Sequence, residues 1–287
     1  MTGFRTYIAA ASIAEAAEAL RIGARVLAGG TDLMLQAGNG GGTDAGTLLN
    51  ISRIGELRGV GRDDGQIRIG ALTTMTDVLA DPLIAETAPV LARAADSFAS
   101  SQIRNAATVG GNICNASPAG DMIVPLLLLD AEVELAAWRD GAVASRRLPL
   151  DQVFLGPGQT CIEAEELLTA VVFPAPAAGF WARYRKSGPR PALEISIVAL
   201  GIAGIRDGDA LRGVRIAMGA VAPTPLRARK AEALLEGRAL DEAAIAEAAA
   251  AIAEEASPID DVRGSAWYRR HLLGVYAERL LRDAEDD

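Results

Sequence analysis

The sequence predicts an α+β protein, and two features of the chain support that prediction. In the C-terminal part, long apolar segments separated by turn residues read as consecutive antiparallel strands, and consecutive helices follow them. The strands are expected at Phe180–Lys186, Ile195–Ile205 and Leu211–Val221, with the clearest turn at Asp207–Asp209, and the helices at Leu226–Leu235, Asp241–Glu255 and Ala266–Arg282. This order favours a three-stranded antiparallel sheet with helices on one face. In the N-terminal part, short strands run into glycine turns that open helices.

Length, composition and charge exclude several classes of protein. The 287 residues allow two or three domains, and half of them are hydrophobic. A formal net charge of −9 makes nucleic acid and anionic membranes poor partners. No apolar stretch approaches the length of a membrane span. Charged residues appear too early in the first twenty positions for a secretory signal, so a cytoplasmic location is expected.

Cysteine and histidine are scarce, which limits the chemistry that side chains can perform. Cys114 and Cys161 are the only cysteines, so the chain alone cannot build an iron–sulfur cluster or a four-cysteine zinc site. His271 is the only histidine and lies in a predicted helix, where a structural or interface role is expected. We therefore predict no catalytic side chain and no metal ligand, and we expect a bound organic cofactor to supply the chemistry.

The N-terminal elements are predicted from caps and turns. Ser12 and Glu15 form a capping box before an amphipathic helix. Arg25–Ala28 reads as a strand that ends at Gly29-Gly30, after which Thr31 and Asp32 can cap a helix that begins at Leu33. A strand is expected at Thr47–Ile51. The G-x-G-x-x-A match at Gly40–Ala45 does not directly follow a strand, so we do not interpret it as a dinucleotide fingerprint.

The middle of the chain is predicted to alternate helices with strands. A central stretch, Gln102–Asp121, lies between the second and third of the predicted helices and reads QIRNAATVGGNICNASPAGD. Strands are expected at Gln66–Ala71, Glu132–Ala137, Val143–Leu148 and Glu166–Phe173. One helix, capped by Thr73 or Thr74, is expected up to Ala80, and two more are expected at Pro82–Ser97 and Met122–Leu129. Turns are expected at Asp140–Gly141 and Phe154–Thr160, and a linker at Pro174–Gly179.

The two glycine turns, Gly29-Gly30 and Gly110-Gly111, are the strongest candidates for a binding site. Glycine lets backbone N–H groups approach a ligand without a Cβ in the way. A helix that starts after such a turn offers unpaired N–H groups and a favourable dipole to a phosphate. The two turns could therefore hold one pyrophosphate from two sides.

Several motifs, in this order, resemble those of one known family. They are LAGGTDLM at Leu27–Met34, IGALTTM at Ile69–Met75, the stretch Gln102–Asp121, RKSGPRPALEISIV at Arg185–Val198, GAVAPTPLRARKAEALLEG at Gly219–Gly237 and a terminal YRRHLLGV. The chain resembles the FAD-binding (medium) subunit of the molybdenum hydroxylases, a group that includes xanthine dehydrogenase and carbon monoxide dehydrogenase. The resemblance covers nearly the whole chain.

The resemblance implies a fold and a domain organisation. The family has a two-subdomain FAD-binding fold of the vanillyl-alcohol-oxidase/PCMH type, followed by a C-terminal α+β domain. By this resemblance, residues 1–57 form FAD-binding subdomain 1, residues 58–176 form FAD-binding subdomain 2, and residues 177–287 form the C-terminal domain.

The resemblance also implies which residues bind FAD. Leu27, Ala28, Gly29, Gly30, Thr31, Asp32 and Leu33 match the first pyrophosphate loop, and Thr108, Gly111, Asn112, Cys114, Asn115 and Asp121 match the second loop and the ribityl and diphosphate positions. Phe98 and Ala99 match positions near the adenosine, and Leu167 and Leu168 match an apolar adenine wall. Lys186 matches a lysine that approaches the flavin or its loop. Leu193 falls where the family can have an acidic residue near the ring, which leaves the electron acceptor open.

The function implied is that of an electron-transfer subunit. A large partner subunit would hold molybdopterin and a small partner would hold two [2Fe–2S] clusters, in a dimer of heterotrimers. This chain would pass electrons from those clusters through FAD to NAD⁺, a quinone or oxygen. Two alternatives remain: a stand-alone FAD-dependent oxidoreductase that acts directly on a small substrate, and a nucleotide-binding or assembly module without redox function.

Overall fold

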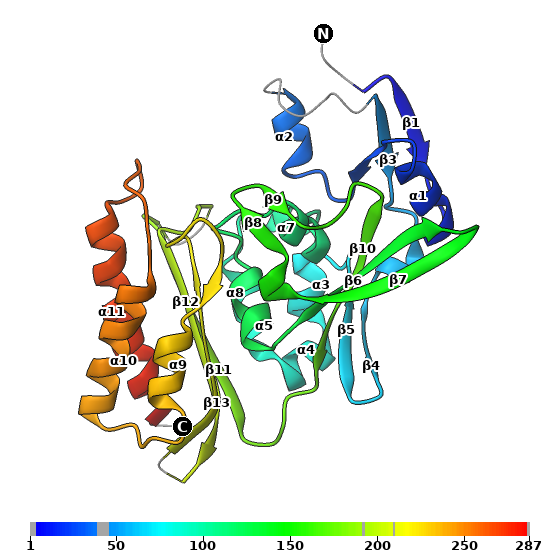
Figure 1. Cartoon of the computed structure of the whole chain (residues 1–287). Coiled ribbons are helices and arrows are strands. Elements are labelled where there is room, and N and C mark those ends of the chain that lie inside the picture. Colours follow the sequence, from blue (N-terminus) through cyan, green and yellow to red (C-terminus); the bar gives the residue numbers. More distant parts are fainter. Residues whose placement is uncertain (1–3, 39–45, 191–192, 209, 286–287) are drawn as a thin grey trace.

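Three sheets lie in a row along the molecule, from the N-terminal part at one end to the C-terminal part at the other (Figure 1). The computed structural model describes residues 4–38, 46–190, 193–208 and 210–285. The predicted G-x-G-x-x-A segment at 40–45 lies outside these residues, as does Asp209 of the predicted turn at 207–209. The mixed α+β class agrees with the prediction.

The first sheet is small and parallel, with strand order β1-β3-β2. Its elements are β1 (Thr6–Ala9), α1 (Ile13–Leu20), β2 (Arg25–Leu27), α2 (Leu33–Gly38), β3 (Thr47–Asn50) and the 3₁₀ turn η1 (Gly55–Leu57). Helix α1 begins where predicted, because the Ser12 side chain accepts a hydrogen bond from the Glu15 backbone N–H. The Glu15 carboxylate in return accepts from Ala11 N rather than from Ser12. The first glycine turn therefore lies between β2 and α2.

The second sheet is antiparallel and has the strand order β4-β5-β10-β6-β7. Its strands are β4 (Val60–Asp63), β5 (Gln66–Gly70), β6 (Glu132–Arg139), β7 (Ala142–Pro149) and β10 (Glu166–Pro174). A 3₁₀ turn and a two-stranded ribbon follow β7, namely η2 (Leu150–Gln152), β8 (Phe154–Gly156) and β9 (Gln159–Thr160). These elements confirm the predicted hairpin, and they place a turn in the segment 154–160 as predicted.

Six short helices accompany the second sheet. They are α3 (Met75–Ala80), α4 (Pro82–Thr87), α5 (Pro89–Asp96), α6 (Ser101–Arg104), α7 (Val109–Cys114) and α8 (Ile123–Leu128). The single helix predicted over Pro82–Ser97 is wrong, since the chain breaks into α4 and α5 at Ala88. The proline at 89 disfavours the helical conformation of the residue before it, and Ala88 has φ −144° and ψ 57°.

The third sheet is antiparallel and has the order β11-β12-β13-β14. Its elements are β11 (Phe180–Ser187), β12 (Val198–Asp207), β13 (Ala210–Gly219), β14 (Leu226–Arg227), α9 (Arg229–Leu235), α10 (Glu242–Glu255) and α11 (Ala266–Glu285). The predicted three-stranded sheet is wrong, because Leu226 and Arg227 pair with Met218 and Ala217 as a fourth strand. The helix expected from Leu226 therefore begins at Arg229. Pairing with β13 prevails over the local helical pattern.

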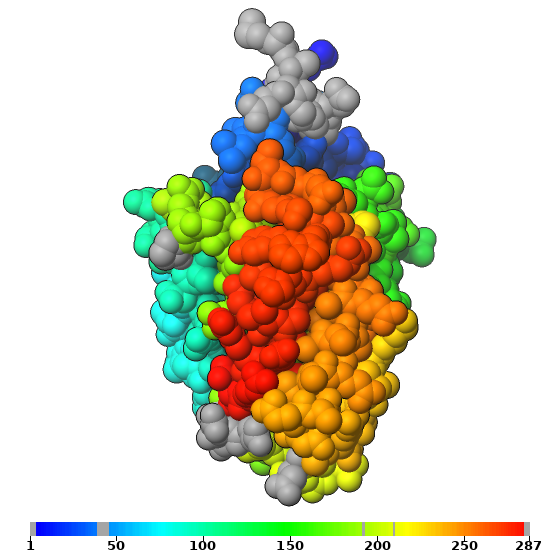
Figure 2. Space-filling model, turned by 90° about the vertical axis from the view of Figure 1, so that its left-hand side faces the viewer, coloured from blue at the N-terminus to red at the C-terminus, as the bar shows by residue number. Residues whose placement is uncertain are grey.

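The third sheet is covered on both faces. Helices α9, α10 and α11 cover its outer face, and Figure 2 shows α10 and α11 side by side on that surface. Its inner face shares a core with the second sheet's helices, to which Tyr184, Ala199, Ala203 and Ala217 contribute. Helix α8 lies against this inner face. The end of the chain is thus joined to the middle through a common apolar core.

Candidate functional site

The first glycine turn presses directly against the segment that precedes the second one. A Cβ atom placed on Gly29 would lie 1.8 Å from the carbonyl oxygen of Ala106. Gly30 has φ +72°, which disfavours residues with side chains. Both glycines are therefore required by the backbone, and they bring two loops that are distant in sequence into contact.

The second glycine turn forms the start of α7. Thr108 caps this helix, with its Oγ1 accepting a hydrogen bond from Gly111 N at 3.0 Å. A Cβ on Gly110 would lie 2.8 Å from the Ala71 Cβ, so this glycine lets α7 pack against the end of β5. Asn112 Oδ1 accepts from Met122 N at 3.2 Å and so ties the turn to the start of α8.

The two turns line one cavity of about 340 Å³. Most of the residues predicted to bind a cofactor border it. They are Ala28, Gly29, Thr31, Asp32, Leu33, Phe98, Thr108, Gly111, Asn112, Cys114, Asn115, Leu167 and Leu168. One part of the lining consists of backbone-rich glycine turns, and another comes from β10, which contributes the apolar Leu167 and Leu168 and the acidic Glu166. A cavity with both polar and apolar parts suits a ligand that has both phosphates and an aromatic ring.

Five predicted residues do not line this cavity. Leu27 and Gly30 lie beside it in the first turn, and Ala99 follows Phe98 with φ +38°. Asp121 and Lys186 form an ion pair elsewhere, with Lys186 Nζ 2.7 Å from Asp121 Oδ2. Both of their side chains are about nine-tenths buried.

The ion pair belongs to a small polar cluster between the helices of the second sheet and the third sheet. Lys186 Nζ also donates to the Ser97 carbonyl at 3.3 Å, and Ser196 Oγ donates to Asp121 Oδ1 at 2.8 Å. Burial raises the pKa of Asp121, and the ammonium of Lys186 and the hydroxyl of Ser196 oppose that shift. Lys186 borders a second cavity of about 410 Å³, and Ser97, which also lines it, adjoins Phe98 of the first cavity.

Three polar residues that the sequence interpretation missed complete the first cavity. Gln36 donates from Nε2 to Asn115 Oδ1 at 3.2 Å, so it links the two turns directly. Arg25 donates in turn to Gln36 Oε1 at 3.2 Å. Glu166 lines the cavity on β10, where the Arg146 guanidinium lowers the pKa of its carboxyl. None of these residues stands in a motif, so only the tertiary structure identifies them.

Burial affects the ionisation of two further groups in the cavity, Asp32 and Cys114. Burial raises the pKa of Asp32 above its usual value, because desolvation disfavours the charged carboxylate. Cys114 is exposed to the cavity but lies deep among protein atoms, and this desolvation raises the pKa of its thiol to about 12. A thiol that stays protonated is a poor nucleophile and a poor metal ligand, which favours a packing role for Cys114.

His271 and Leu193 lie apart from the first cavity. His271 is on α11, where its ring stacks on Trp267 at a centroid distance of 5.5 Å. Leu193 is exposed and has φ +62°. No group of three or more potential metal-binding side chains occurs within the described residues. No helix of the described part of the chain is long and apolar enough to cross a membrane.

Comparison with known families identifies the cofactor that the chain binds. Residues 2–176 match the model of the FAD binding domain in molybdopterin dehydrogenase, and residues 183–284 match that of the CO dehydrogenase flavoprotein C-terminal domain. The chain belongs to this flavoprotein family. As a member of the flavoprotein family, it is an FAD-binding oxidoreductase subunit.

Relatives of the flavoprotein family match most of the chain. The xanthine dehydrogenase FAD-binding subunit of Escherichia coli is 32% identical over 288 residues, covering 99% of this chain and 97% of the relative. The carbon monoxide dehydrogenase medium chain of Hydrogenophaga pseudoflava is 32% identical over 241 residues, covering 83% of this chain and 81% of the relative.

Solved structures agree with the sequence relatives. A carbon monoxide dehydrogenase chain from Hydrogenophaga pseudoflava has a TM-score of 0.91 and 31% identity, and the match covers 97% of this chain and 96% of that one. A chain of quinoline 2-oxidoreductase from Pseudomonas putida has a TM-score of 0.89 and 26% identity, with 99% and 98% covered. The flavoprotein family fold thus extends over essentially the whole chain.

The residues of the first cavity fit FAD. The turn at Gly29 has no side chain, so its backbone can approach a diphosphate without a basic cluster. The N–H groups of Met34 and Gln36 in the first turn of α2 already donate to the carbonyls of Gly30 and Asp32. The buried side chains of Leu167 and Leu168 suit an aromatic ring.

Proposed function

We propose that this chain passes electrons within a molybdenum hydroxylase. A large subunit with molybdopterin would oxidise the substrate, and a small subunit with two [2Fe–2S] clusters would deliver the electrons to this chain. Bound FAD would supply the ability to accept electrons singly or in pairs and to pass them to NAD⁺, a quinone or oxygen. The observation that supports the proposal most is the meeting of both glycine turns at one cavity, as the contact between Gly29 and Ala106 requires.

The assembly and the location belong to the same proposal. The relatives include proteins named as medium chains and as FAD-binding subunits, which supports large and small partner subunits here. We propose a dimer of such heterotrimers in the cytoplasm. We also propose that the two N-terminal parts, residues 1–57 and 58–176, form a vanillyl-alcohol-oxidase/PCMH-type fold around FAD, with residues 177–287 as the third part. The separate hydrogen-bonding of the three sheets supports this division.

The roles of the cavity residues follow from their chemistry. The turn Ala28–Asp32 and the segment Thr108–Asn115 would hold the diphosphate and ribityl groups, and Leu167 and Leu168 would contact the adenine. Phe98 would lie beside the adenosine. Asp121 and Lys186 would act from the neighbouring polar cluster, with Lys186 toward the flavin ring.

A stand-alone oxidoreductase is the weaker alternative. Direct oxidation of a small substrate needs an acid or base beside the flavin. The described lining of the first cavity includes no histidine, and of its two carboxyls Glu166 is paired with Arg146 and Asp32 follows the first glycine turn. The single histidine, His271, stacks on Trp267 on an outer helix. This arrangement favours the relay function.

Reduction of the bound flavin tests the proposal. The purified chain is loaded with FAD, and loss of the visible flavin absorption is followed under anaerobic conditions. We expect a reduced [2Fe–2S] partner to bleach the flavin, and aldehydes or heterocycles alone to leave it oxidised. Direct bleaching by a small substrate would instead support the stand-alone enzyme. A chain that cannot take up FAD would support the nucleotide-binding module without redox function.

A further inference from the structure

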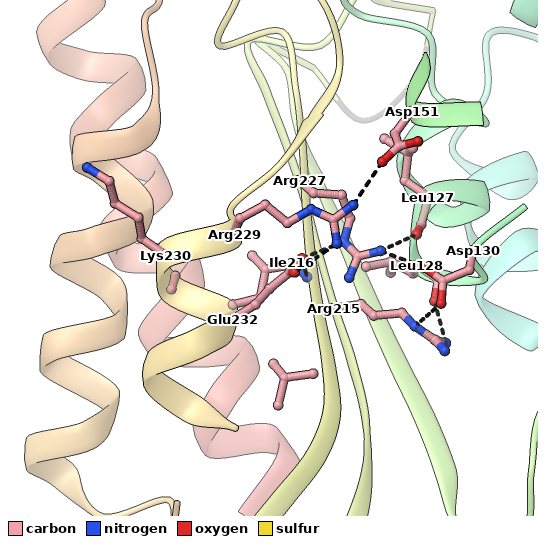
Figure 3. A network of polar contacts seen from close by, with 12 residues as sticks. Leu127, Leu128, Asp130, Asp151, Arg215, Ile216, Arg227, Arg229, Lys230 and Glu232 are labelled. Atoms are coloured by element: carbon pink, nitrogen blue, oxygen red, sulfur yellow. Dashed lines mark hydrogen bonds and ion pairs between the residues drawn. The ribbon is translucent and has the colours of Figure 1, made fainter. Parts of the chain in front are cut away.

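Helix α8 is held at both ends by side chains of the C-terminal part of the chain. At its start, Asp121 accepts hydrogen bonds from Lys186 on β11 and from Ser196, which precedes β12. At its end, Arg215 on β13 and Arg227 on β14 contact the residues that close the helix (Figure 3). The structure therefore fixes the position of α8 from outside the FAD-binding domain.

The contacts at the end of α8 combine hydrogen bonds with ion pairs. Arg215 Nη1 donates to the Leu128 carbonyl at 3.1 Å, and Arg227 Nη1 donates to the Leu127 carbonyl at 3.5 Å. The same two guanidinium groups grip Asp130, with Arg215 Nε 2.7 Å from Oδ2 and Arg227 Nη1 2.6 Å from Oδ1 (Figure 3). Because the last carbonyls of a helix have no helical donors and its C-terminus has partial negative charge, two cations there are favourable.

Arg227 is preorganised for this role. Its side chain is 7% exposed, and its Nε pairs with Glu232, which also accepts from the Ile216 backbone N–H at 2.9 Å. Asp130 has φ +50°, a conformation that costs energy for a residue with a side chain. The two guanidinium groups compensate by holding Asp130 in place. The end of α8 is thus held by the Arg227 guanidinium, which Glu232 in turn holds in place.

The middle of α8 packs on glycines of the third sheet. A Cβ on Gly201 would lie 2.6 Å from Leu128 Cδ1, and a Cβ on Gly219 would lie 2.9 Å from Val124 Cγ2. The helix therefore lies close to β12 and β13. A shift of α8 would have to displace these contacts as well.

The start of α8 is tied to the first cavity. Asn112, which lines the cavity, accepts a hydrogen bond from Met122 N immediately before the helix. A displacement of α8 therefore moves a residue of the second glycine turn. Arg215 and Arg227 line no part of that cavity, so any influence on it must pass through the helix.

We propose that Arg215 and Arg227 are positioning residues for FAD. By anchoring the end of α8 at Asp130, they hold Asn112 and its turn in the geometry that binds the cofactor. This inference rests on the proposed function, because it assumes that the first cavity binds FAD. Beyond the proposed function, Arg215 and Arg227 of the C-terminal part would determine the affinity for FAD without contacting the cofactor.

The test compares two matched variants at the same domain boundary. Asp130→Asn removes the carboxylate that both arginines hold. Asp151→Asn removes the carboxylate that pairs with Arg229 at 2.8 Å across the same boundary but does not contact α8 in a polar interaction (Figure 3). The dissociation constant for FAD is measured by quenching of flavin fluorescence, together with the visible circular dichroism of the bound flavin.

We expect Asp130→Asn to weaken FAD binding about tenfold, which corresponds to ~1.4 kcal/mol, and to alter the flavin dichroism. Asp151→Asn should stay within about twofold. Equal effects of the two variants, or unchanged affinity in Asp130→Asn, would overturn the inference while leaving FAD binding by the wild-type chain intact. Failure of the wild-type chain to bind FAD would overturn the proposed function itself.

Arg215 provides a second test if Asp130→Asn does not fold. Arg215→Lys keeps a cation near the end of α8 and should retain FAD affinity within about threefold, whereas Arg215→Met should lose about tenfold. Equal losses would show that the charge at the helix end is not the cause, and would overturn the inference.

A double-mutant cycle tests the route through Asn112. In an Asn112→Ala background the bond to Met122 is absent, so the effect of Asp130→Asn on FAD affinity should fall from about tenfold to below about twofold. A full tenfold effect in that background would contradict coupling through this contact.

Discussion

At the scale of single residues, close backbone contacts determine the candidate site. The contact between Gly29 and the Ala106 carbonyl joins two loops that are 77 positions apart in the chain. The pair Asp121–Lys186 likewise joins distant segments, the loop before α8 and strand β11 of the third sheet, but through side chains. The first contact requires that residue 29 has no Cβ, and the second requires the charges of Asp121 and Lys186. Substitutions should therefore affect the two contacts differently.

Gly29→Ala should damage both stability and cofactor binding. The added methyl group would overlap the Ala106 carbonyl at 1.8 Å, so the loops must separate, at a cost of about 1–3 kcal/mol. Thermal unfolding and FAD titration measure the two effects. Gly61→Ala is the matched control, because no atom lies within 4 Å of its added Cβ and its φ is not positive. A Gly29→Ala protein that matched this control would contradict the close contact.

The sequence could indicate glycine turns but not their partners. Gly29-Gly30 and Gly110-Gly111 stand out because their neighbours form strands, caps and helix starts, which are local signals. Gln36, Arg25 and Glu166 have no local signal, since only the contact between distant segments gives them a place at the cavity. The family resemblance supplied the remaining site residues, which spacing alone could not.

At the scale of elements, caps and short pairings decide where helices begin and end. Pro89 divides a predicted helix in two, and two residues of pairing turn the predicted start of α9 into the strand β14. The first effect can be anticipated from the sequence. The second cannot, because Leu226 and Arg227 form a strand only when β13 lies beside them.

The stability of the loop before α11 should depend on pH through the carboxyl of Asp261. Desolvation would raise the pKa of Asp261, but hydrogen bonds from the Arg263 N–H and the Arg269 guanidinium prevail and lower it to about 2. Because the folded-state pKa lies below the unfolded value of about 3.9, the ionised carboxylate stabilises the fold above pH ~4, and this contribution is lost as the pH falls toward 2.

We therefore expect Asp261→Asn to be less stable than the wild type near neutral pH. The difference in unfolding free energy should narrow as the pH falls from about 4 toward 2. Urea unfolding of both proteins at a series of pH values measures it. A difference that stayed constant over this range would show that the charge of Asp261 does not contribute.

At the scale of the whole molecule, the first cavity lies between parts of the chain that belong to separate sheets. Its lining comes from the loop after β2, from α7 and from β10. A ligand bound there contacts both the parallel and the antiparallel sheet. Binding should therefore stabilise the chain as a whole rather than one part of it.

FAD should raise the midpoint of thermal unfolding. At about 100 times its dissociation constant, a ligand that binds only the folded state adds about 2.7 kcal/mol to the unfolding free energy. Differential scanning calorimetry with and without FAD measures the shift. Gly111→Val should show no shift, because a branched side chain at this position of the cavity lining obstructs the approach of the phosphates. Equal shifts in both proteins would place FAD elsewhere.

The shared core and the anchored helix also bear on how the chain holds together. Tyr184, Ala199 and Ala203 pack among residues of the second sheet's helices, and arginines on β13 and β14 grip the end of α8. We expect these contacts to hold the two parts together even when the connecting segment 175–179 is cut. Proteolytic cleavage in this segment, or co-expression of the parts before and after it as two separate polypeptides, should still give a complex that co-purifies.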